Sequence, residues 1–183
     1  MLNIARELKK KNIAEYLIFM WQIEDLIRAQ NFDIQNIEKH LIQPQNLKQE
    51  DKELEIEWFQ ELIDMMYAEG IKDIGHLQIN QNIIINLNDL HLQLISCTKY
   101  PFYNAAYYKV LPFIVELRSK HENEAISEIE ICFNALYGVM LLRLQQKEVS
   151  TDTEKAVKAI ADFIAILANH YEKDKAGELK LED

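Results

Sequence analysis

The chain has 183 residues and is acidic, because 30 Asp and Glu outnumber 20 Lys and Arg and give a formal net charge of −10. Apolar residues make up 49% of the sequence, enough for the core of one ordinary domain, whereas Gly and Pro number only 4 and 3. The scarcity of turn residues argues against a β-sandwich, and the negative charge argues against binding to nucleic acids or anionic lipids.

The N-terminal segment resembles a secretion signal in part, because a basic stretch over residues 6–11 precedes an apolar run over 13–21. However, Glu15 interrupts the apolar run, and polar residues follow it where a cleavage site needs small ones. Elsewhere, no apolar stretch reaches the roughly 18 residues that cross a bilayer. Two cysteines are also too few for a secreted disulfide framework. We therefore predict a cytoplasmic protein without membrane contacts.

The first part of the chain predicts three helices. Asn12, followed three positions later by a glutamate, is typical of an N-cap and begins a helix that extends to about residue 30. A short helix after Asp33 ends before Pro44, since the residue that precedes a proline is disfavoured in helical geometry. A longer third helix ends near Gly70, a residue common just after a helix C-terminus.

Residues 77–95 are compatible with two structures. Over residues 77–87 apolar residues alternate with Asn and Gln almost as in a strand, and Asn88 and Asp89 are turn residues suited to a hairpin. Apolar residues also recur at spacings of four and three positions, which places them on one helical face: Ile83, Leu87, Leu90, Leu94 and Cys97. We favour the helix, with the hairpin as the alternative.

Three further segments follow the 3.6-residue period and end near Leu117, Leu144 and Tyr171. Thr151, with a glutamate three positions later, predicts the N-cap of the last one. Gly138 interrupts a strong helical pattern, which indicates either close helix packing or an accidental glycine on a solvent-exposed face.

The predicted fold class is therefore all-α, an antiparallel bundle of six or seven helices. We expect one domain over residues 1–173 and a charged, disordered tail over residues 174–183.

Three stretches of the sequence resemble an uncharacterised family of all-helical proteins from Bacteroidetes bacteria. They are residues 12–29 (NIAEYLIFMWQIEDLIRA), 100–117 (YPFYNAAYYKVLPFIVEL) and 133–144 (FNALYGVMLLRL). The resemblance covers nearly the whole chain and implies a cytoplasmic helical fold. It implies no activity, ligand or catalytic residue.

No motif in the sequence predicts catalysis, a metal or a cofactor. The Glu-x-x-His pairs of two-metal helical bundles are absent, and the carboxylates three or four positions from a histidine, such as Asp73 with His76 and Glu124 with His121, lie near predicted helix ends. The two cysteines, Cys97 and Cys132, lie in apolar surroundings and are predicted core residues. There is no glycine-rich phosphate loop either. An enzyme of unrecognised type is therefore a disfavoured interpretation.

The helix after Asn12 carries the first candidate site. Glu24 and Arg28 lie one helical turn apart, and the simplest interpretation is an exposed ion pair worth a few tenths of a kcal/mol. Alternatively, this face lines a cleft in which Trp21 forms an apolar wall and Glu24, Asp25 and Arg28 supply polar groups. Such a cleft would suit a small polar ligand.

The second candidate site is an aromatic cluster over residues 100–108. Tyr103 and Tyr107 share the predicted buried face, whereas Tyr108 points about 100° away, toward Pro112 and Val115. Pro112 lies within the helical pattern and predicts a kink, which is either tolerated or part of a surface that binds a partner.

Three functions follow, in order of preference. The first is a non-catalytic helical interaction protein that binds itself or another protein. The second is a small-molecule binding protein with a cleft near Trp21, Glu24 and Arg28, and the third is the unrecognised enzyme. No predicted helix is basic, so a nucleic-acid partner is not expected.

Overall fold

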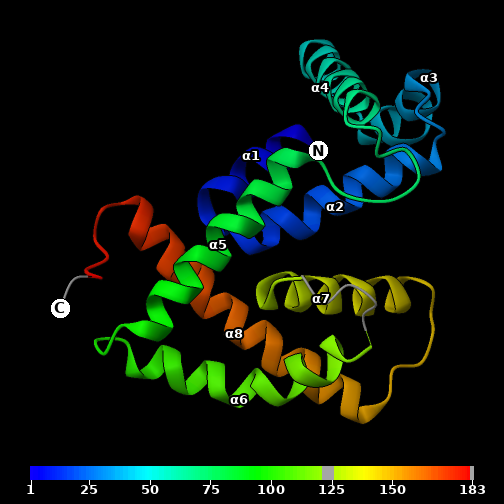
Figure 1. The fold of residues 1–183 in the computed structure, drawn as a ribbon. Helices are drawn as coiled ribbons and strands as arrows, with labels where there is room; N and C mark the ends of the chain where they lie inside the picture. Colours follow the sequence, from blue (N-terminus) through cyan, green and yellow to red (C-terminus); the bar gives the residue numbers. More distant parts are fainter. Residues whose placement is uncertain (121–125, 182–183) are drawn as a thin grey trace. The chain divides into compact units, whose positions relative to one another are not determined.

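The computed structural model describes residues 1–120 and 126–181, and it confirms the all-α fold (Figure 1). The described residues form eight α-helices and no strand. The helices are α1 (Leu2–Lys11), α2 (Ile13–Ala29), α3 (Ile34–Ile37), α4 (Gln49–Ala68), α5 (Gln78–Ser96), α6 (Pro101–Arg118), α7 (Glu128–Leu144) and α8 (Thr151–Lys175). A π-helical turn, η1 (Glu38–Ile42), and a 3-10 turn, η2 (Gln43–Gln45), continue α3. None of these helices has the length and hydropathy required of a membrane span.

Seven of these helices correspond to predicted ones, and α1 is additional. It is separate from α2 because Asn12 adopts an extended conformation, with φ −158° and ψ 99°. The Asn12 side chain accepts hydrogen bonds from the backbone N–H groups of Ala14 and Glu15 at 3.1 and 3.3 Å, as expected of an N-cap. Residues 78–96 form the continuous helix α5, so the helical interpretation of this segment is confirmed and the hairpin is wrong.

The chain divides into two compact units, residues 1–82 and residues 83–183, with the boundary inside α5. We call them unit 1 and unit 2 and describe each separately. The single domain over residues 1–173 stays a prediction.

In unit 1, α1 and α2 lie side by side, and α4 packs against α1, α2 and α3 (Figure 1). Helix α2 is apolar around most of its circumference and is correspondingly buried on more than one face. Its buried residues are Ile13, Tyr16, Leu17, Met20, Trp21, Ile23, Glu24 and Ile27. Helix α4 ends as predicted, because Gly70 adopts φ 70° and the next N–H, of Ile71, bonds to the Met66 carbonyl at 3.1 Å.

In unit 2, helices α6, α7 and α8 pack against one another (Figure 1). Helices α6 and α8 are antiparallel, because Tyr103 contacts the ring of His170 whereas Tyr107, one turn later, contacts the ring of Phe163. Helix α6 continues through Pro112 to Arg118. The unit's two cysteines are free thiols and are buried, which confirms their assignment to the core.

Two local predictions for unit 2 are corrected. The N-cap of α8 is Ser150, one residue before the predicted Thr151, and its Oγ accepts a hydrogen bond from the Thr153 N–H at 3.2 Å. Tyr107 is only partly buried, because its side chain lies at the margin of the buried face that Tyr103 occupies fully. The disorder predicted for residues 174–183 stays a prediction; in its described part the Lys180 N–H bonds to the Tyr100 hydroxyl at 3.2 Å.

Candidate functional site

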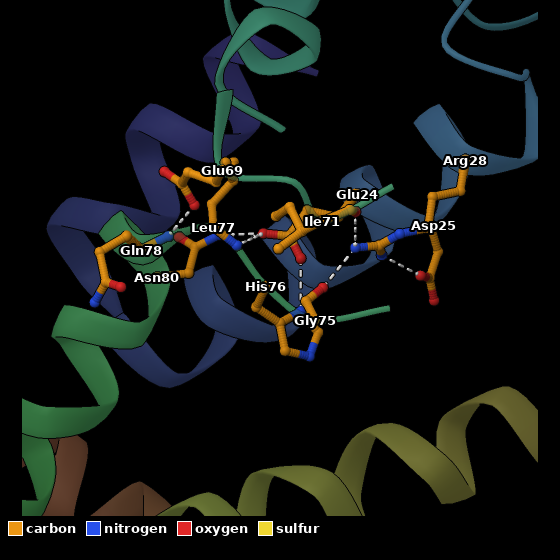
Figure 2. Close-up of polar contacts among 10 residues, drawn as sticks. All are labelled: Glu24, Asp25, Arg28, Glu69, Ile71, Gly75, His76, Leu77, Gln78 and Asn80. Atoms are coloured by element: carbon orange, nitrogen blue, oxygen red, sulfur yellow. Dashed lines mark hydrogen bonds and ion pairs between the residues drawn. The ribbon is translucent and has the colours of Figure 1, made fainter. Parts of the chain in front are cut away.

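Glu24 is the centre of a buried polar cluster in unit 1 (Figure 2). Its side chain is fully buried and accepts hydrogen bonds from three donors of the segment that enters α5. Oε1 accepts from the Leu77 N–H at 3.1 Å and from the Asn80 side-chain amide at 2.7 Å, and Oε2 lies 2.6 Å from Nδ1 of His76. Several donors offset the cost of burying a carboxylate. Because Glu24 lies on α2 and its donors lie at residues 76–80, these hydrogen bonds join α2 to the start of α5.

His76 is the most accessible group of this Glu24 cluster. Its side chain is 20% exposed, and its ring stacks on Trp21 with centroids 3.9 Å apart and planes 10° from parallel. Because a carboxylate can only accept a hydrogen bond, Nδ1 of His76 is the donor in its contact with Glu24. Nε2 has no hydrogen-bond partner among the described residues.

The predicted ion pair between Glu24 and Arg28 is wrong. Arg28 instead pairs with Asp25, at 2.8 Å between Nη1 and Oδ1, and Nη2 donates to the carbonyl oxygens of Ile71, at 3.2 Å, and Gly75 (Figure 2). Donors from residues 76–80 occupy the Glu24 carboxylate, so Arg28 binds the preceding loop. The two side chains thus hold successive parts of one connection, between the end of α4 and the start of α5.

A second carboxylate strengthens the same connection. Helix α5 begins at Gln78, whose N–H donates to Glu69 Oε2 at 2.7 Å, while the preceding N–H, of Leu77, donates to Glu24. Leucine has no side-chain acceptor, so α5 is capped by glutamates from elsewhere in unit 1. Two negative charges at a helix N-terminus are also stabilised by the helix dipole.

The predicted cleft near Trp21, Glu24 and Arg28 stays a prediction. Trp21 is buried, and the polar atoms of the other two residues largely bind the protein itself. A ligand at Glu24 would have to displace protein donors. The described geometry is that of a structural contact that holds the start of α5 against α2, with the partly exposed His76 at its edge.

Unit 2 contains a second buried polar cluster, centred on His91. This histidine is 1% exposed; its Nδ1 lies 2.7 Å from the Tyr103 hydroxyl, and its Nε2 lies 3.7 Å from a carboxylate oxygen of Glu128. Hydrogen bonding to His91 lowers the pKa of Glu128. Burial raises the pKa of Tyr103, and burial together with a hydrogen bond to Glu128 raises the pKa of Tyr107 to about 12. Both tyrosines therefore stay neutral at physiological pH and serve as hydrogen-bonding groups.

Sequence reasoning missed both histidines as cluster members. A usable signal existed for His91, which interrupts the apolar face of α5 between Leu87 and Leu94 and therefore had to be buried with a partner. His76 had no such signal, because it lies just before α5 and its partner is 52 positions away. Among the described residues no group of three or more His, Cys, Asp or Glu side chains is placed to bind a metal. His121 and Glu124 lie outside the described residues.

Helix α6 has an exposed apolar face. Tyr108 and Val115 are 67% and 58% exposed, and Pro112, between them, is also exposed. Pro101 and Ala105 extend the same row toward the start of the helix and are exposed as well. We call these five residues the α6 outer face. Their spacings of four, three, four and three positions place them along one side of the helix.

The comparison with protein families identifies the family of this chain. Residues 2–178 match the model of a domain of unknown function, DUF4924. The chain belongs to this family. Comparisons with curated proteins and with solved structures found no match. Membership in the DUF4924 family therefore covers nearly the whole chain and assigns no chemistry to its residues.

Proposed function

We propose that this protein is a non-catalytic interaction module that self-associates through the α6 outer face. The observation that supports the proposal is the exposure of Tyr108, Pro112 and Val115 on one side of the helix. An exposed tyrosine with apolar neighbours at heptad-like spacing is typical of helix–helix interfaces. We further propose that it acts in the cytoplasm, where its two thiols would stay reduced, and that it originates from a Bacteroidetes bacterium.

A second copy of the chain is the occupant we propose for this face. The row repeats at spacings of four and three residues, so it can pack against an identical row from an antiparallel copy. Lys109 and Glu116 lie along the same edge of the row and carry opposite charges, so the edge has no net charge. An apolar face with a neutral edge can pair with itself although the whole chain is acidic.

The size of the face predicts a weak dimer. Helix α6 has 18 residues and is therefore about 27 Å long and about 10 Å wide. Its projected area of roughly 270 Å² is well below the roughly 800 Å² per partner of a standard stable interface. We expect a transient dimer with a dissociation constant in the micromolar range or above. High salt should strengthen it, because two chains of charge −10 repel each other.

The experiment is sedimentation equilibrium of wild type, Tyr108→Ala and Leu144→Ala over a wide range of protein concentration. Leu144 is the matched control, because it is 70% exposed in the same unit but lies on α7. Tyr108→Ala should weaken dimerisation at least tenfold, with an unchanged helical circular dichroism spectrum, and Leu144→Ala should not. A wild type that is monomeric at millimolar concentration and high salt would refute the proposal, as would equal effects of the two substitutions.

A further inference from the structure

Unit 2 contains a cavity of about 730 Å³ between α6, α7 and α8. We call it the α6–α8 cavity. Its apolar lining comes from all three helices and includes Phe113, Leu117, Leu142, Val157 and Ile160. This volume is within the range of roughly 300–1,000 Å³ that small-molecule sites occupy, and such sites are mainly apolar with a few polar groups.

Small residues keep the α6–α8 cavity open. Gly138 lies in its wall, and a Cβ atom added there would meet no atom within 4 Å. Ala135, three positions earlier on α7, and Ala156, on α8, also line it. Gly138 therefore borders open space, so the close helix packing predicted as one explanation is wrong, and the alternative of an accidental glycine on an exposed face stays a prediction. A glycine inside a helix is less stabilising than an alanine, and here packing does not require it.

The charged groups around the cavity are paired with one another. Lys120 Nζ lies 2.7 Å from Glu116 Oε1, and Lys155 Nζ lies 3.3 Å from Asp152 Oδ1. By contrast, the side-chain amide of Asn134, one turn before Gly138 on α7, has no hydrogen-bond partner among the described residues and lines the cavity. The cavity thus offers a hydrogen-bonding amide and apolar walls, and no uncompensated charge.

We propose that the α6–α8 cavity is a binding site for an uncharged, mainly apolar small molecule that carries a hydroxyl or carbonyl group for Asn134. Its hydrophobic body would lie along Gly138 and the alanines on either side. This site is distinct from the α6 outer face, whose residues do not line it. Binding of such a ligand does not depend on self-association.

The test uses two fluorescent probes that share one ring system. N-phenyl-1-naphthylamine is uncharged, and 8-anilino-1-naphthalenesulfonate adds a sulfonate. We expect the uncharged probe to bind the wild-type protein at one site, at least tenfold more tightly than the sulfonate. Amide chemical-shift changes on binding should be concentrated at Ala135, Gly138 and Ala156. This mapping needs no variant and is unaffected by whether a variant folds.

Variants of Gly138 locate the site independently. Gly138→Phe should fill the cavity and weaken binding of the uncharged probe at least tenfold, whereas the matched control Gly138→Ala should retain it. Circular dichroism will verify that both variants stay helical, and Ala156→Phe blocks the cavity from the opposite wall if Gly138→Phe does not fold. Failure of the wild type to bind the uncharged probe, shift changes elsewhere or full binding by Gly138→Phe would overturn the proposal. Equal affinity for both probes would overturn the assignment to uncharged ligands.

Discussion

Removal of the Glu24 side chain tests the cluster that joins α2 to α5. Glu24→Ala leaves two donors without their acceptor, the Leu77 N–H and the Asn80 side-chain amide, both of which bond this carboxylate in the interior. The His76 side chain is 20% exposed, so its Nδ1 can bind water when Glu24 is absent, and the loss of this hydrogen bond costs less. Each buried donor left unpaired costs about 1–3 kcal/mol. Together with the lost charged contacts, we expect Glu24→Ala to reduce the free energy of unfolding by about 3–5 kcal/mol.

Glu24→Gln separates hydrogen bonding from charge. The glutamine keeps an oxygen for Leu77 and Asn80, and its amide can donate to Nδ1 of His76 once that ring changes tautomer. We expect this variant to lose only about 1 kcal/mol, because hydrogen bonds to neutral groups are weaker than those to charged ones. Comparison of the two losses in unfolding free energy shows how much of the stabilisation comes from hydrogen bonds to the buried donors and how much comes from the negative charge.

The assay is urea unfolding followed by tryptophan fluorescence. Both tryptophans, Trp21 and Trp58, belong to unit 1, so the signal reports the unit that contains the cluster. Glu61→Ala is the matched control, because Glu61 is an exposed glutamate on α4 in the same unit. A loss below 1 kcal/mol for Glu24→Ala, or a loss equal to that of the control, would show that Glu24 is not buried and bonded as described.

Two further predictions concern charged and titrating groups. Arg28→Ala should cost about 1.5–3 kcal/mol in the same assay, because its side chain is 14% exposed and its guanidinium donates to two loop carbonyls; a loss under 0.5 kcal/mol would contradict this. Ionisation of Tyr107 at high pH should destabilise unit 2. The pKa of Tyr107 is raised from 10.0 to about 12 in the folded protein, which means that folding favours the neutral side chain. Its stabilisation is complete below pH 10 and is lost as the pH rises toward 12. The urea midpoint by circular dichroism should therefore fall less between pH 9 and 11 in Tyr107→Phe than in wild type, and equal decreases would refute the assignment.

The helices themselves were predictable because their signals are local. Seven of the eight were predicted, six of them from the apolar period and the short α3 from Asp33 and Pro44, and Asn12 and Gly70 marked helix ends through backbone preferences that act within a few residues. The same local reasoning placed Tyr108, Pro112 and Val115 away from the buried face of α6, and all three are exposed. Helix α1 was missed because its apolar content is low and its end depends on the extended conformation of a single residue.

The tertiary structure decided which polar groups are paired. Glu24 and Arg28 are neighbours on one helical turn, yet their partners lie 43 to 56 positions further along the chain, apart from Asp25. Likewise, Gly138 borders a cavity because of where α6 and α8 lie, which its own helix does not specify. Helical periodicity determines which side of a helix is apolar, because it depends on spacing along the chain. The partner of a buried carboxylate, or the space beside a glycine, depends on helices distant in sequence, so it emerges only when they pack.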